Sequence, residues 1–283
     1  MTAPAPSPAL VDLHMHSTAS DGAKAPADVV AEAQRVGLAA IALTDHDTLA
    51  GLAEARAAGD ACGIRVIAGV ELSAVEGEQE THLLGLHLSD TDEMERRLVE
   101  LREMRHRRAD AMVAKLNALG IAVTMEEVLA QAAGGAIGRP HVARAVVAKG
   151  AAADLREAFD RFLGNGRPAY VGKDRLTMQD AIAMIHRAGG LAVLAHPGPA
   201  ATRARLEGLK ALGLDGVEVR HPGHSDEEIG RILRLAESLE LLPSGGSDWH
   251  GATDGWRTLG VMRVPAEWLA MQDAAVARRA AAA

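Results

Sequence analysis

The stretch "VDLHMHSTASDG", residues 11–22, places an apolar strand directly before two histidines. Side chains at positions i and i+2 of a strand point to the same face, so His14 and His16 present two imidazoles side by side. Asp21 adds a carboxylate in the loop that follows. The stretch therefore predicts either a solvated polar strand end or one edge of a metal site, and the rest of the chain decides between the two.

Short apolar runs alternate with helical patterns through most of the sequence. The predicted strands lie at 10–16, 39–45, 65–73, 81–88, 191–196, 215–220 and 241–247, with a weaker one at 259–264. Helical patterns at 26–36, 178–188 and 226–239 lie between them. This alternation predicts βαβ units with a mostly parallel sheet, and about seven such units favour a barrel over an open sheet.

The alternation stops between about residues 92 and 170. A long charged helix, "DEMERRLVELREMRHRRADAMVAKLNALG", is followed there by further helix-like segments. We predict an α/β barrel from residues 10–91 and 171–264, with an all-helical insertion at 92–170 that contributes to a substrate pocket. Residues 265–283 are predicted to form a C-terminal helix or tail.

Composition excludes several classes of site. Cys62 is the single cysteine, so an intramolecular disulfide and a thiolate metal cluster are both impossible. A formal net charge of −8 and an aromatic content of 2% argue against a broad nucleic-acid or membrane surface. The N-terminus lacks a signal-peptide pattern, and no long apolar run is present. We therefore expect a cytoplasmic protein with no membrane association and no obligate protein partner.

Side chains that bind metals follow nearly every predicted strand. Nine of the 12 histidines lie at predicted strand ends. In an α/β barrel the carboxyl ends of the strands carry the active site. Imidazole and carboxylate donors without thiolate suit zinc, manganese or iron, and these donors are too many for one ion. We predict two or three divalent ions that share a bridging carboxylate. The donors in chain order are His14, His16, Asp21, Asp45, His46, Asp47, Glu71, His82, His87, His196, His221, His224, Asp248 and His250.

The ordered motifs "DLHMHSTASDG", "ALTDHDT", "GVELS", "THLLGLH", "AHPG" and "SGGSDWHG" resemble those of the PHP (polymerase and histidinol phosphatase) family of metal-dependent phosphoesterases, from about residue 10 to 264. The resemblance implies a distorted (β/α)7 barrel with a trinuclear metal centre. It further implies a first ion on His14, His16, Glu71 and Asp248, a second on Glu71, His82 and His196, and a third on Asp21, His46 and His250.

At two positions this ligand set needs a further choice, of the metal and of the histidine on the fourth strand. Asp21 stands where many relatives have histidine, which favours a harder metal, so we predict Mn²⁺, with Zn²⁺ or Fe²⁺ as alternatives. On the fourth strand His82 is preferred to His87, because it lies where the family places its ligand.

Such a centre would use a metal-bound hydroxide as the nucleophile, with no protein residue in that role. Arg139 and His141 of "GRPH", with Lys173, are predicted to contact substrate phosphate, because arginine offers a bidentate fork. Alternatively, Gly138 and Pro140 only shape a helix start and Arg139 is solvated. His221 and His224 are candidates for a general acid or a further phosphate contact.

"GRPHVAR" and "FLGNGRPAYV" are similar to one PHP branch, that of nucleoside 3′,5′-bisphosphate phosphatases and 5′–3′ exoribonucleases. We predict a phosphomonoesterase that removes the 3′-phosphate of a nucleoside 3′,5′-bisphosphate to give the 5′-monophosphate. The main alternative is a 5′–3′ exonuclease on short RNA or DNA. Weaker alternatives are a histidinol phosphatase, a metal-dependent amidohydrolase and a non-catalytic metal-binding module.

Overall fold

The computed structural model describes residues 9–77, 79–132, 137–172 and 176–282. The chain divides into two compact units. The barrel unit comprises residues 1–95 and 176–283, and the helical unit comprises residues 96–175. Each unit is built around a hydrophobic core of its own.

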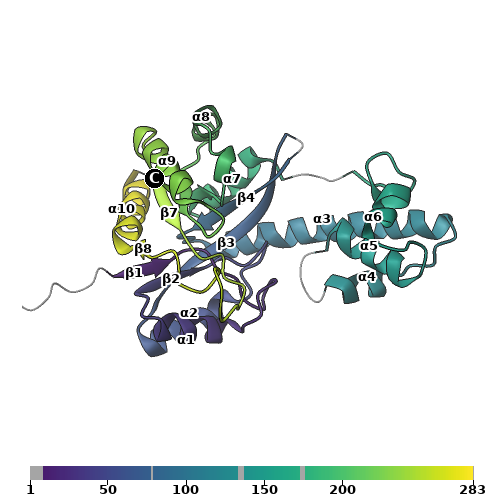
Figure 1. Ribbon diagram of the computed structural model, residues 1–283, viewed down its shortest axis with the longest axis horizontal. Coiled ribbons are helices and arrows are strands. Elements are labelled where there is room, and N and C mark those ends of the chain that lie inside the picture. The colour runs from purple at the N-terminus through teal and green to yellow at the C-terminus, as the bar shows by residue number, and fades with distance from the viewer. Residues whose placement is uncertain (1–8, 78, 133–136, 173–175, 283) are drawn as a thin grey trace, which may run out of the picture. The chain divides into compact units, whose positions relative to one another are not determined.

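One eight-stranded sheet forms the centre of the barrel unit and curves into a nearly closed barrel (Figure 1). Its strands lie side by side in the order β7-β6-β5-β4-β3-β2-β1-β8. The predicted distorted α/β barrel is confirmed. The strands are β1 Leu10–Asp12, β2 Ala40–Leu43, β3 Arg65–Glu76, β4 Gln79–Leu86, β5 Leu191–Leu194, β6 Gly216–Arg220, β7 Leu242–Gly245 and β8 Val264–Pro265.

A seam between the segments that follow β1 and β7 closes the barrel. The amide of Leu13 donates to the carbonyl of Gly245 at 3.1 Å, and the amide of Asp248 donates to the carbonyl of His14 at 2.9 Å. A Cβ on Gly246 would lie 2.4 Å from the backbone nitrogen of His14, so only glycine permits this approach. The seam therefore brings two predicted metal ligands from distant parts of the chain together.

The direction of β4 differs from that of most other strands. The pairs β1–β2, β2–β3, β5–β6 and β6–β7 are parallel, whereas β4 pairs antiparallel with both β3 and β5. The short β8 is also antiparallel, to β1. The beginning of β4 therefore lies at the barrel end where the parallel strands finish.

This reversal separates the two histidines of the fourth strand. His82 lies near the start of β4, whereas His87 follows its end. The Nε2 atom of His87 lies 3.1 Å from Oε1 of Gln272, and its Nδ1 lies 3.5 Å from Oδ1 of Asp273. Both partners belong to helix α10. The expectation that His87 shares the end of the barrel with the other donors is wrong, because an antiparallel strand carries it to the opposite end.

Helices connect most of the strands, and three of them begin at a residue with a short hydroxyl side chain. The hydroxyls of Thr177, Thr202 and Ser225 accept hydrogen bonds from backbone amides in the first turns of α7, α8 and α9. Such caps satisfy amides that have no partner within the helix. The helices of the barrel unit are α1 Pro26–Arg35, α2 Leu52–Cys62, α7 Met178–Arg187, α8 Arg203–Ala211, α9 Asp226–Ser238 and α10 Ala266–Ala282, with a 3-10 turn at Gly198–Ala200.

Aliphatic side chains fill the core of the barrel unit, as the low aromatic content requires. One cluster joins Val11 and Leu13 to Leu84, Leu86 and Val193 of other strands. A second cluster packs strand residues, among them Ile41, against α1 and includes the buried Trp249. Cys62, the last residue of α2, is a free, partly buried thiol.

The helical unit has no strand among its described residues. Helix α3, Thr91–Ala118, supplies its first element from residue 96 onwards, and the long helix agrees with the sequence pattern. Apolar residues of several helices pack into one cluster, including Met112, Leu116, Val128 and Val142. The other elements are α4 Met125–Ala132, α5 Arg139–Ala148, α6 Leu155–Ala158 and a π-helical turn at Phe159–Leu163.

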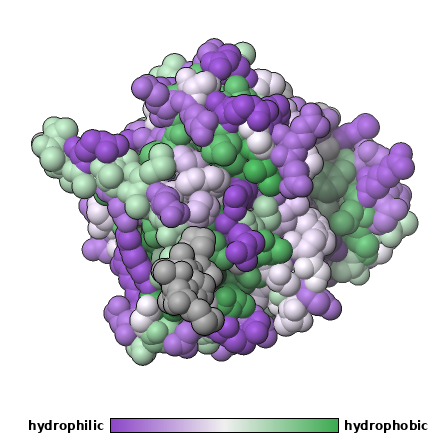
Figure 2. Space-filling model, turned by 60° about the vertical axis from the view of Figure 1, so that its left-hand side comes forward, coloured by the Kyte–Doolittle hydropathy of each residue, from purple (hydrophilic) through white to green (hydrophobic). Residues whose placement is uncertain are grey.

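Hydrophilic and hydrophobic residues are interspersed on the face drawn in Figure 2. Single exposed apolar side chains such as Val36 and Met271 fit this pattern. Within the described ranges, no helix is both long enough and apolar enough to cross a membrane.

Candidate metal centre

Glu71 of β3 lies at the middle of the predicted metal site and is only 1% exposed. Its two carboxylate oxygens face different groups of histidines. Oε2 lies 3.2 Å from Nε2 of His14, 3.2 Å from Nε2 of His16 and 3.4 Å from Nδ1 of His46. Oε1 lies 2.9 Å from Nδ1 of His82 and 3.1 Å from Nε2 of His196. One carboxylate thus contacts imidazoles on two sides.

Asp248, Asp21 and His250 complete the cluster. Oδ1 of Asp248 lies 3.5 Å from Nε2 of His14 and 3.2 Å from Nε2 of His16. Oδ1 of Asp21 lies 3.4 Å from Nε2 of His250 and 3.6 Å from Nδ1 of His16. All nine residues predicted as ligands therefore lie at one end of the barrel.

Three groups of donors have the geometry for a cation, because the ligand atoms within each group lie within 4.8 Å of one another. Only imidazole nitrogens and carboxylate oxygens are present, a set that suits divalent metals such as Mn²⁺, Fe²⁺ or Zn²⁺. Both ring nitrogens of His16 are buried and neither has a partner at hydrogen-bonding geometry, although two carboxylate oxygens lie 3.2 Å from Nε2, an arrangement that fits a metal ligand. The groups are His14, His16, Glu71 and Asp248; His16, Asp21, His46 and His250; and His46, Glu71 and His82.

The buried carboxylates and imidazoles of this cluster shift one another's pKa values. Burial raises the pKa of the Glu71 carboxyl, but His14 and the neighbouring imidazoles outweigh burial and hold that pKa well below its usual range. Burial lowers the pKa of His16, whereas Asp248 and Glu71 raise it more strongly, to about 9. The lowered pKa of Glu71 favours the charged carboxylate, which is the form that binds a metal ion.

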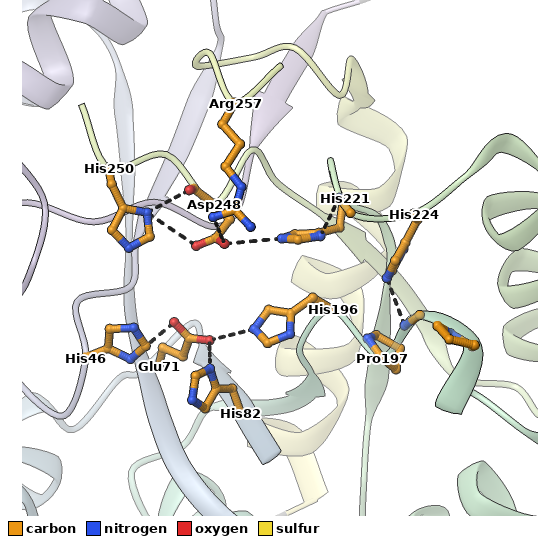
Figure 3. A pocket seen from close by; sticks show the side chains of 13 residues that line it. His46, Glu71, His82, His196, Pro197, His221, His224, Asp248, His250 and Arg257 are labelled. Carbon is orange, nitrogen blue, oxygen red and sulfur yellow. Dashed lines mark hydrogen bonds and ion pairs between the residues drawn. The ribbon is translucent and has the colours of Figure 1, made fainter. Parts of the chain in front are cut away.

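A cavity of about 380 Å³ opens beside the cluster (Figure 3). His46, Glu71, His82 and His196 form one side of it in this view, and Asp248 faces them. His196 and Asp248 have left-handed backbone conformations, with φ of +28° and +49°. Such conformations in non-glycine residues cost energy and concentrate at functional sites.

The two remaining candidate histidines differ in their contacts. His224 donates from Nδ1 to the carbonyl of Val219 at 2.9 Å, and its Nε2 accepts from the amide of Gly198 at 3.0 Å. Nδ1 of His221 accepts from the amide of Gly223 at 3.0 Å, and Nε2 lies 3.3 Å from Oδ2 of Asp248. Both histidines therefore use both ring nitrogens, but His224 contacts only backbone groups, whereas His221 directs an N–H towards Asp248, a predicted metal ligand.

Sequence reasoning missed Glu218, a fully buried glutamate of β6. Its Oε1 lies 3.1 Å from Nδ1 of His14, and its Oε2 accepts from the backbone amide of His196 at 2.7 Å. A carboxylate on one ring nitrogen leaves the other nitrogen free to bind metal and fixes the ring orientation. A glutamate inside the apolar run "GVEVR" was the available signal.

Replacing Glu218 by Gln is expected to weaken Mn²⁺ binding roughly 10- to 100-fold. The amide has one acceptor oxygen, so it cannot accept from both His14 and His196. Titration of metal-free protein with Mn²⁺ measures this change. Glu207→Gln, which removes an exposed carboxylate of α8, is the matched control. Wild-type affinity in a folded Glu218→Gln protein would contradict the expected role.

The predicted phosphate contacts lie in the helical unit or outside the described residues. Nη1 of Arg139 donates to Oδ1 of Asn165 at 3.2 Å, and its guanidinium lies 5.6 Å from the ring centre of Tyr170. Nδ1 of His141 accepts from the amide of Gly138 at 2.9 Å, which caps α5. Lys173 lies outside the described residues. Phosphate binding by these residues stays a prediction.

Residues 12–164 match the model of the PHP domain family. The chain belongs to the PHP family. The PHP protein is 38% identical over 257 residues to a 3′,5′-nucleoside bisphosphate phosphatase of Chromobacterium violaceum, covering 88% of this chain and 90% of the relative. It is 36% identical over 259 residues to a 5′-3′ exoribonuclease of Haemophilus influenzae, covering 88% and 92%.

A solved structure supports the same family. A chain from Bifidobacterium adolescentis described as a metal-dependent phosphoesterase is similar to this PHP protein, with a TM-score of 0.71 and 32% sequence identity. The similarity covers 94% of this chain and 96% of that chain. The family resemblance carried by the sequence motifs is therefore confirmed.

Proposed function

We propose that this PHP protein is a phosphoric ester hydrolase that removes the 3′-phosphate of nucleoside 3′,5′-bisphosphates and releases nucleoside 5′-monophosphates. The observation that carries this proposal is the Glu71 carboxylate, which faces imidazoles through both oxygens beside an open cavity. The substrate is supported by the similarity to the bisphosphate phosphatase of C. violaceum.

Two to three divalent ions, with Mn²⁺ preferred, are the proposed cofactors. His14, His16, Glu71 and Asp248 would hold the first ion. Glu71, His82 and His196 would hold the second, and Asp21, His46 and His250 the third. Bound ions would lower the pKa of water and neutralise charge on a phosphoryl group.

The protein's own residues orient this centre and handle protons. Glu218 fixes the ring of His14 through Nδ1 and holds the backbone of His196 through its amide. Nδ1 of His221 accepts a hydrogen bond, so Nε2 carries the proton of the neutral ring. His221 lines the cavity, with this N–H on Oδ2 of Asp248, and we assign it as the proton donor that turns from Asp248 to the leaving oxygen. His224 instead holds the loop at Gly198.

A 5′–3′ exonuclease is the second candidate function. The 36% identity to the exoribonuclease of H. influenzae favours it, and both activities break a phosphate ester bond. The cavity volume of about 380 Å³ is at the small end for ligand sites, which favours a mononucleotide as substrate.

Phosphate release in Mn²⁺ tests the proposal against its alternatives. The substrates are adenosine 3′,5′-bisphosphate, 3′-AMP, 5′-AMP, histidinol phosphate and a short 5′-phosphorylated RNA. We expect rapid conversion of the bisphosphate to 5′-AMP and little turnover of either monophosphate. Stepwise release of mononucleotides from the RNA, with the bisphosphate a poor substrate, would assign the exonuclease instead. Turnover of none of these compounds by metal-loaded protein would overturn both.

A further inference from the structure

Arg257 is the single lysine or arginine among the described residues that line the cavity. A phosphate monoester carries about 1.5 to 2 negative charges near neutral pH. The carboxylates of Glu71 and Asp248 also face the cavity, and they would oppose a phosphate unless cations balance them. Arg257 is thus the fixed positive charge that this wall offers in addition to metal ions.

The guanidinium of Arg257 contacts the carboxylate of Asp248, a proposed ligand of the first ion. Nη1 lies 3.0 Å from Oδ2 of Asp248, and the other oxygen, Oδ1, faces His14 and His16. Figure 3 shows the side chain of Arg257 extending towards Asp248 between His250 and His221. The Nε atom of Arg257 is buried and has no hydrogen-bond partner among the described residues. A guanidinium has five N–H donors, so this side chain can bind Asp248 and a phosphate oxygen together.

Trp256 precedes Arg257, and its ring centre lies 4.8 Å from the guanidinium carbon of Arg257. This tryptophan is 62% exposed, the largest exposed fraction among the large hydrophobic residues described. The other two tryptophans are engaged in packing, since Trp249 is 2% exposed and Trp268 packs against a core cluster. Trp256 does not itself line the cavity, but it lies against Arg257, which does, and its exposed indole offers a flat surface on which a nucleobase can stack.

We propose that Arg257 and Trp256 form the substrate-recognition element of this site. Arg257 donates hydrogen bonds to a non-bridging oxygen of the reacting phosphate, and Trp256 stacks on the nucleobase. The inference rests on the proposed function and assigns its contacts with the reacting phosphate and the nucleobase to two adjacent residues.

The role of Arg257 is tested with inorganic phosphate as a competitive inhibitor at saturating Mn²⁺. Arg257→Gln should raise the inhibition constant for phosphate roughly 10- to 100-fold, with Arg257→Lys in between. The affinity for Mn²⁺ should change less than threefold in both variants. If Arg257→Gln weakens Mn²⁺ binding and leaves phosphate inhibition unchanged, Arg257 only positions Asp248 and the phosphate contact is wrong. Arg35→Gln, which removes an exposed guanidinium on α1, is the control.

The role of Trp256 is tested by tryptophan fluorescence with 5′-AMP in the presence of Mn²⁺. We expect 5′-AMP to quench the wild-type emission and Trp256→Phe to abolish the quenching while it retains most of the affinity. Trp256→Ala should weaken 5′-AMP and bisphosphate binding about 10-fold and leave inhibition by inorganic phosphate unchanged. Wild-type affinity for 5′-AMP in Trp256→Ala would overturn stacking.

These readouts separate the two proposals. Quenching by 5′-AMP that depends on Trp256, with no hydrolysis of any phosphate ester, would support nucleotide recognition and overturn the hydrolase function. Hydrolysis of the bisphosphate at wild-type KM in Trp256→Ala would support the hydrolase function and overturn nucleobase recognition by Trp256.

Discussion

Replacing Glu71 by Gln is expected to lower kcat/KM for the bisphosphate on the order of 10³-fold or more. Among the described residues of the site, Glu71 alone has one oxygen that faces the imidazoles of His14 and His16 and another that faces those of His82 and His196. An amide keeps the size of the side chain but removes its charge, and its nitrogen cannot accept from a metal-facing histidine or bind a cation. The amount of bound Mn²⁺ should fall with the activity.

Glu76→Gln is the matched control for Glu71→Gln, because Glu76 lies on the same strand with its carboxylate on Arg205. This variant should keep full metal content and turnover. Circular dichroism of both variants checks that the barrel has folded. Turnover within tenfold of wild type in folded Glu71→Gln would show that the metal assignment is wrong.

Removal of metal is expected to abolish turnover and to lower the melting temperature by about 5–10 °C. A ligand that binds only the folded state stabilises it by about 2.7 kcal/mol at a concentration 100 times its Kd. For chains of 150–250 residues each kcal/mol shifts the melting temperature about 2–4 °C. The ligands come from separated segments of the chain, from His14 to His250, so the unfolded chain does not present the site.

Thermal unfolding with EDTA and after readdition of Mn²⁺ measures this shift. Recovery of both activity and melting temperature on readdition is the expected result. The Glu71→Gln protein should respond to Mn²⁺ much less. Equal melting temperatures for chelated and Mn²⁺-loaded wild-type protein would contradict a metal centre held by these ligands.

Much of the fold and of the candidate site could be predicted from the sequence because both follow local patterns. Apolar runs such as "AIAL" and "LAVL" are buried along their whole length, as strands with two covered faces require. Most of these runs end in or just before polar residues, so many side chains at the carboxyl end of the sheet could be predicted one strand at a time. The two-residue period of an extended segment placed His14 and His16 on one face, and the donors elsewhere in the chain were needed to predict a metal site; in the structure β1 ends at Asp12 and both histidines follow it.

Strand direction and long-range contacts could not be obtained in this way. His82 and His87 lie at opposite ends of the barrel because β4 runs antiparallel to its neighbours. The local sequence around either histidine does not reveal that direction. Glu218 and Arg257 lie far along the chain from His14, and only the folded barrel brings all three to the same site. The apolar run "GVEVR" marks Glu218 only as a buried charge, and no spacing in the sequence links Glu218 or Arg257 to His14.

The seam between β1 and β7 has a consequence for synthesis of the chain. The carbonyl of His14 accepts from the amide of Asp248, so the first and nearly the last segments of the barrel meet at the first proposed ion. Contacts of such long sequence separation form late in folding. A nascent chain that has not yet exposed Asp248 holds an incomplete set of donors. We therefore expect hydrolytic activity only once the barrel is complete, and none in a chain that terminates before Asp248.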